Sequence, residues 1–168
     1  LDIFSNFETF TFYFKIIVTG IIPAVFVGLF TPIQDIIDGS PYLLLVTGIS
    51  YLFFSILLIF SERINKSENI GINEITIKQA FIIGLAQSIA LLPGISRSGV
   101  TLLMAIYLGV KKADAIYYSL LLGIPTIFGA WSLTFINQSF TVNADIIIPT
   151  IVAMFTGVLA IKVLISFT

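Results

Sequence analysis

The sequence predicts an all-α polytopic membrane protein with about four transmembrane helices and one re-entrant helix hairpin. Of its 168 residues, 58% are hydrophobic and only 10% are charged, whereas an ordinary soluble domain carries about 25% charged residues. With a mean hydropathy of +1.10, the chain could not cover a soluble fold with polar surface. The few charges are also separated by apolar intervals that are long enough to cross a bilayer.

Four apolar intervals between charged residues give the predicted spanning helices. They cover residues 16–34, 39–61, 116–136 and 146–167. Each is close to the roughly 20 residues that cross about 30 Å of bilayer hydrocarbon. We therefore predict a single membrane domain over residues 1–168.

Residues 78–110 are also apolar, but they are interrupted in the middle by Pro93 and Gly94. As helices, the two halves, 79–92 and 99–108, would rise by only about 21 Å and about 15 Å, so neither crosses the membrane alone. Proline and glycine both disfavour a helix interior. We predict a re-entrant hairpin over 78–110, because non-helical backbone at membrane depth is tolerated where it is buried in protein or lines a wet cavity.

The distribution of lysine and arginine supports this topology. If the hairpin returns to the side from which it enters, seven of the eight cations lie on one face, which is taken as cytoplasmic. These seven are Lys15, Arg63, Lys66, Lys78, Lys111, Lys112 and Lys162, and the opposite loops hold Asp35, Asp38 and Asp145. The eighth cation, Arg97, then lies at a hairpin tip that points outward.

The hairpin tip, residues 93–101, has the composition of an anion site. The guanidinium of Arg97 presents a planar fork of donors that suits phosphate oxygens. Ser96 or Ser98 can cap the second half-helix, whose N-terminus attracts anions. An arginine at membrane depth is costly unless it is paired or hydrated, so we favour a functional site over a structural loop in which Arg97 pairs with a carboxylate. Gln87 either contacts the ligand or bonds across helices, and the sequence leaves both open. The candidate site residues are Arg97, Ser96, Ser98, Thr101, Gly94, Gly99 and Gln87.

The first and third predicted spans each contain two glycines. Gly20 and Gly28 belong to the first span, and Gly123 and Gly129 belong to the third. Small residues allow helix backbones to approach closely in a membrane. We therefore expect these glycines to mark close helix contacts rather than ligand sites.

The run from Gly84 to Thr101 (GLAQSIALLPGISRSGVT) resembles the second signature of the bacitracin-resistance (BacA/UppP) family of undecaprenyl-diphosphate phosphatases. Residues 108–125 and the Ile-Pro-Ala-Val run at 22–25, with Gly28, also fit that pattern. The Pro-Gly-x-Ser-Arg-Ser-Gly-x-Thr string is specific. The resemblance covers most of the chain, which aligns with about the C-terminal two-thirds of the family.

The resemblance implies a polytopic hydrolase built from inverted repeats, each with a re-entrant hairpin, of which this chain would hold about half. The family removes one phosphate from the undecaprenyl diphosphate carrier, giving the monophosphate for peptidoglycan synthesis and hence resistance to bacitracin. It implies a bacterial plasma-membrane location, an active site facing the periplasmic or outer side, and a divalent cation, magnesium or calcium. By matching, Arg97 and Ser96 take catalytic roles, and substrate-binding roles fall to Ser98, Thr101, Gly94, Gly99 and Gln87.

The first signature of that family, which carries acidic residues and a histidine, has no counterpart in this sequence. The chain has no histidine and no cysteine, so no metal ligand is assigned to it. We expect a truncated or partial member that holds the phosphate-binding half of the site and is inactive alone.

Two alternatives stay open. A membrane transporter, flippase or pseudoenzyme would bind a phosphorylated lipid or another anion without hydrolysis, because broken helices that point N-termini at an anion also occur in transporters. A purely structural membrane subunit explains the spans but not the serines and arginine at the tip. The expected partners are a lipid diphosphate and membrane lipid. Nucleic acid is excluded because a net charge of -1 offers no basic stripe, and a homo-oligomer is left open.

Overall fold

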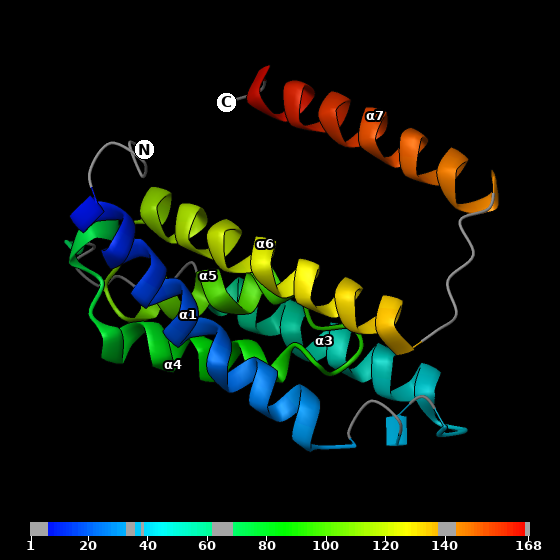
Figure 1. Ribbon diagram of the computed structural model, residues 1–168. Coiled ribbons are helices and arrows are strands. Elements are labelled where there is room, and N and C mark those ends of the chain that lie inside the picture. Colours follow the sequence, from blue (N-terminus) through cyan, green and yellow to red (C-terminus); the bar gives the residue numbers. More distant parts are fainter. Residues whose placement is uncertain (1–6, 33–35, 38, 62–68, 138–143, 167–168) are drawn as a thin grey trace. The chain divides into compact units, whose positions relative to one another are not determined.

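The computed structural model of the chain describes residues 7–32, 36–37, 39–61, 69–137 and 144–166 (Figure 1). The elements are α1 (Phe7–Phe30), α3 (Leu43–Ser61), the short 3-10 helix η1 (Ile72–Glu74), α4 (Ile77–Ile89), α5 (Arg97–Tyr107), α6 (Lys112–Asn137) and α7 (Ala144–Ser166). Within these ranges the only extended pairing is an isolated bridge between Ile70 and Val110, which confirms the all-α class. The chain divides into two compact units, Leu1–Gly129 and Ala130–Thr168, and the first carries the candidate site.

A helix lies at each of the four predicted spans, as α1, α3, α6 and α7. The predicted bounds of the first span, 16–34, are wrong, because α1 begins at Phe7 and ends at Phe30. Thr31 precedes Pro32, and a residue before proline disfavours the α conformation, which ends the helix there.

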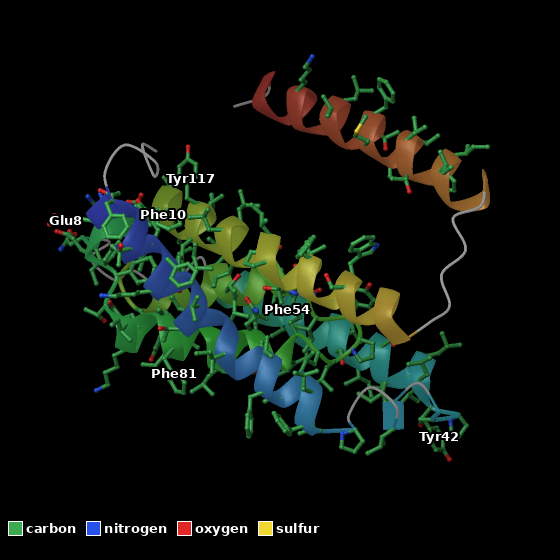
Figure 2. All side chains as sticks on the ribbon, in the orientation of Figure 1. Glu8, Phe10, Tyr42, Phe54, Phe81 and Tyr117 are labelled. Atoms are coloured by element: carbon green, nitrogen blue, oxygen red, sulfur yellow. The ribbon has the colours of Figure 1, made fainter. Side chains whose placement is uncertain are left out.

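Two stretches of the described residues are both long and apolar enough to cross a membrane, Phe7–Phe30 and Lys112–Ser132. Shorter apolar helices cover Leu43–Ile59 and Ile147–Ala160. Large side chains such as Phe81 and Tyr117 point outward from the first unit (Figure 2). A surface of this kind suits lipid better than water, while the count of four spans stays a prediction.

Helix α1 packs most extensively against α4. The backbones meet at Gly20 and Gly84, where a Cβ added to Gly84 would overlap the carbonyl oxygen of Gly20. A Cβ added to Gly20 would lie 2.7 Å from Cδ2 of Leu122 on α6, and the hydroxyl of Tyr118 donates a hydrogen bond to the Ile16 carbonyl at 2.8 Å. The predicted close contact at Gly20 is therefore confirmed.

The corresponding prediction for Gly123 and Gly129 finds no support within the first unit and stays a prediction. Among the described residues, no atom lies within 4 Å of a Cβ built at either position. At Gly28 the nearest atom, Cδ2 of Leu91, is 3.7 Å away, which is ordinary van der Waals contact. Within the first unit, the space beside these two glycines of α6 holds no other described side chain.

The hairpin starts and ends at the same end of the first unit. The Gln79 amide in the first turn of α4 donates to the Leu108 carbonyl, just after α5, at 3.4 Å. The N–H groups of Asn69 and Ile70 donate to the Gly109 carbonyl at 3.2 and 3.1 Å, and Lys111 N–H donates to the Ile70 carbonyl at 3.0 Å. The predicted helix–break–helix shape is confirmed, and its insertion into the bilayer stays a prediction.

Candidate functional site

The break between α4 and α5 is a tight turn over residues 90–96. Gly94 has φ of +91°, a conformation that favours glycine because a Cβ is strained there. An added Cβ would also lie 2.7 Å from the carbonyl oxygen of Thr47 on α3. The turn therefore requires glycine for both its backbone angle and its contact with α3.

Ser96 is the N-cap of α5. Its Oγ accepts a hydrogen bond from the Gly99 N–H at 3.2 Å and lies 3.4 Å from Oγ of Ser98. Capping satisfies one of the N–H groups that the first helical turn leaves without an intrahelical partner. Both serines are exposed and Arg97 is half-buried, so hydroxyls and a guanidinium surround the positive end of the helix dipole.

The guanidinium of Arg97 forms no hydrogen bond or ion pair with any residue that the structure describes. The alternative in which Arg97 pairs with a carboxylate thus finds no support in the described part of the chain. Arg97 and Ser98 line a groove of about 520 Å³, together with Ser119, Gly123 and further residues of α6. An anion that enters this groove meets a charged donor whose hydrogen-bonding capacity is unused.

Gln87 lies in the last turns of α4 with only 2% of its surface exposed. Its Nε2 donates to Oγ1 of Thr126 on α6 at 3.5 Å, so the bond across helices, one of the two alternatives that the sequence left open, is present. Its Oε1 is buried and has no hydrogen-bond partner among the described residues. An unpartnered buried acceptor costs about 1–3 kcal/mol, so this oxygen can gain from a donor, and the ligand role of Gln87 stays a prediction.

Thr101 is 1% exposed and turns back into its own helix. Its Oγ1 lies 3.1 Å from the carbonyl oxygen of Arg97 and 3.0 Å from that of Ser98. The hydroxyl therefore bonds within the first turn of α5, where it steadies the two residues that line the groove. Its role as a ligand stays a prediction.

Helix α3 packs against the tip of the hairpin. This contact was not predicted from the sequence. Phe54 is 5% exposed and lies inside the first unit (Figure 2). A Cβ added to Gly99 would lie 2.6 Å from Cζ of Phe54, so the ring packs directly on the first turn of α5. The groove residues Ser119 and Gly123 were also missed, although their spacing of four residues placed a polar and a small side chain on one face of a span.

The described residues do not fit a divalent cation. They contain no group of three acidic, histidine or cysteine side chains that could hold a metal ion. The donors at the tip are a guanidinium and hydroxyls, which suit an anion, whereas magnesium and calcium take oxygen ligands such as carboxylates.

The comparison with protein families decides the classification. The model of the family described as bacitracin resistance protein BacA matches residues 3–168. The chain belongs to the BacA family. This membership and the apolar helices of the described residues together indicate an integral membrane protein.

Several curated BacA relatives carry the name undecaprenyl-diphosphatase. One from Methanococcus maripaludis strain C7 is 40% identical over 148 residues, covering 86% of this chain and 56% of the relative. One from Thermodesulfovibrio yellowstonii is 36% identical over 156 residues, covering 90% of this chain and 58% of the relative. One from Lachnoclostridium phytofermentans is 34% identical over 167 residues, covering 98% of this chain and 60% of the relative. The chain thus spans somewhat more than half the length of these relatives.

Proposed function

We propose that this chain is the phosphate-binding part of an undecaprenyl-diphosphate phosphatase, a hydrolase that releases one phosphate from the lipid diphosphate. The observation that carries the proposal is the guanidinium of Arg97, which has no partner among the described residues and lies in the first turn of α5, on a groove with an apolar wall. A lipid diphosphate has the matching chemistry, a charged headgroup on an apolar chain. Relatives named undecaprenyl-diphosphatase support the same substrate.

In this proposal Arg97 binds two oxygens of the diphosphate and stabilises the charge that develops when the phosphoanhydride bond breaks. Ser98 and the N-terminus of α5 add donors to the same anion. Ser96 positions Arg97 by capping the helix, and the Gln87 oxygen is available to a donor near the groove. The base and the ligands of the divalent cation are assigned to the remainder of the full-length protein.

The proposed site faces the periplasmic or outer side of the plasma membrane. Lys78 lies in the first turn of α4 and Lys111 follows α5, and the hydrogen bond from the Gln79 side chain to the Leu108 carbonyl joins these two ends. Since lysine-rich ends stay in the cytoplasm, the tip with Arg97 at the other end of the hairpin points outward. The hairpin then re-enters the membrane without crossing it.

Because phosphate binding is assigned to this chain and the base and metal ligands to the rest of the full-length protein, we expect the 168-residue chain to bind undecaprenyl diphosphate without releasing phosphate. We expect release by the full-length gene product in detergent and less than about one hundredth of that rate from the 168 residues, because one oriented catalytic group contributes about 10²–10⁴-fold. Phosphate release is measured with and without added magnesium or calcium, and far-ultraviolet circular dichroism checks that the shorter chain is helical. Robust metal-dependent release from the 168 residues would contradict the proposal.

The helix cap gives a second prediction, which concerns positioning. We expect Ser96→Ala to destabilise the full-length protein by about 1 kcal/mol and to weaken binding of undecaprenyl diphosphate by up to about fivefold, because the first turn of α5 loosens. Thr76→Ala is the matched control, since Thr76 caps α4 at the opposite end of the hairpin. It should lower the Tm similarly and leave the Kd unchanged. Equal Kd values for the two variants would show that the cap of α5 does not position the site.

The broken pair α4 and α5 also suits a transporter or flippase, since transporters point half-helix N-termini at anionic substrates. The two candidates differ in the fate of the headgroup. A full-length protein that moves undecaprenyl diphosphate across vesicles and releases no phosphate would favour transport over hydrolysis. A protein that binds the lipid and does neither would be a pseudoenzyme.

A further inference from the structure

We infer that α6 carries an apolar track for the part of the substrate's lipid chain next to the diphosphate, and that Gly123 sets the width of this track. The inference rests on the proposed function, because it takes the headgroup to lie at Arg97. It adds a specificity-determining residue that the sequence pattern had assigned to helix packing.

The groove combines a polar part and an apolar part in one space. Arg97, Ser98 and Ser119 supply the polar part, and the apolar lining includes Leu120, Ile124 and Ile127 of α6. These three α6 side chains are exposed by 57%, 67% and 63%. Their spacing of four and three residues places them on one helix face. A molecule whose anionic headgroup touches Arg97 can therefore lay its chain against this face.

A second groove in the first unit has a lining of apolar side chains alone and serves as a comparison. It lies on α1, has a volume of about 300 Å³, and is lined by Val18, Ile21, Ile22, Val25, Phe26 and Phe30. No polar side chain lines it. The groove on α6 differs because it joins an arginine and two serines to the apolar face, which is the pattern expected for a lipid with a strongly anionic headgroup.

The length of the track limits what it holds. From Leu120 to Ile127, α6 rises by about 11 Å, which is much shorter than an undecaprenyl chain. The track therefore receives only the isoprene units closest to the diphosphate, and the rest of the chain lies in the bilayer.

Gly123 is the smallest residue that lines the groove, and it lies one helical turn from both Ser119 and Ile127. No described atom lies within 4 Å of a Cβ built there, so a larger side chain would enter the groove without meeting another described residue of the first unit. Glycine in a helix interior costs about 1 kcal/mol relative to alanine, and among the described residues of the first unit no close backbone contact explains its presence at position 123. In this inference, glycine at position 123 leaves room for the lipid chain of the substrate.

Gly129 provides a matched control on the same helix. A Cβ built there also meets no described atom within 4 Å, but Gly129 does not line the groove. Substituting leucine at either position makes the same change in propensity and hydrophobicity. Only Gly123→Leu adds volume next to Arg97 and Ser98.

The experiment compares the full-length wild type, Gly123→Leu and Gly129→Leu in detergent. The Kd is measured for undecaprenyl diphosphate and for inorganic pyrophosphate, which is the headgroup without a chain. We expect Gly123→Leu to weaken undecaprenyl diphosphate binding by about tenfold or more, because the chain loses buried apolar contact, and to change pyrophosphate binding by less than about twofold. Gly129→Leu should change neither, and the smaller Gly123→Ala should give an intermediate loss of about threefold.

Two results would overturn the inference that the lipid chain lies along α6. Equal Kd values for Gly123→Leu and Gly129→Leu would show that no lipid chain uses the groove. Equal losses for the two ligands would show that the substitution disturbs the tip or that another segment of the full-length protein occupies the groove. Failure of the proposed function looks different: a wild type that binds undecaprenyl diphosphate without releasing phosphate refutes the phosphatase, while the Kd comparison still decides the track. A wild type that binds neither ligand refutes both.

Discussion

Replacing Arg97 with alanine in the full-length protein is expected to lower phosphate release from undecaprenyl diphosphate by about 10²–10³-fold. Losing one preorganised donor to a developing oxyanion has an effect of this size, and Arg97 is the cation on the groove with no partner among the described residues. Arg97→Lys should recover part of the loss, because lysine keeps the charge but lacks the planar fork that binds two oxygens.

The matched control for Arg97→Ala is Lys78→Ala. Lys78 is a cation of the same hairpin, and it lies in the first turn of α4 at the end far from the tip. This variant should retain release within about twofold of the wild type, because an exposed surface charge contributes little. Release at the wild-type rate by Arg97→Ala would remove Arg97 from the site, and an equal loss in Lys78→Ala would point to overall charge instead of a local contact.

Replacing Gly84 with alanine is expected to destabilise the protein by about 3 kcal/mol, the upper end of the usual cost of overpacking. The added Cβ would overlap the Gly20 carbonyl, and backbone cannot move aside as a flexible side chain can. Helices α1 and α4 would have to separate along their most extensive contact. For a chain of this size the Tm should fall by about 6–12 °C, measured by thermal unfolding in detergent.

Gly48→Ala serves as the control for Gly84→Ala. Gly48 also lies inside a helix, α3, but a Cβ built there meets no described atom within 4 Å. Alanine at this position should leave the Tm unchanged or raise it slightly, since it improves helix propensity by about 1 kcal/mol. If both variants unfold at the same temperature, the contact between Gly20 and Gly84 does not limit the approach of the two helices.

The predicted bounds of the first span differ from those of α1 because charged residues were taken as the ends of the helix. Charged residues delimited the first span at 16–34, yet α1 extends back to Phe7 past Lys15. A single charge near a helix end does not stop a helix, whereas Pro32 does, because it restricts the residue before it. The break in the hairpin was predicted at the right place, because Pro93 and Gly94 act on the backbone directly.

The sequence by itself determined the helical class, the positions of the long apolar helices and the break at Pro93 and Gly94, and it placed a guanidinium between two hydroxyls at Ser96, Arg97 and Ser98. These features follow from composition, helix propensity and the chemistry of adjacent side chains, all of which are local. Only the tertiary structure decided which helices meet the tip. The packing of Phe54 on Gly99, the bond from Gln87 to Thr126 and the open space beside Gly123 depend on contacts between residues far apart in the chain. The physical reason is that an apolar helix has no strongly polar face to mark its neighbours, so its sequence does not say which side will contact protein and which will contact lipid.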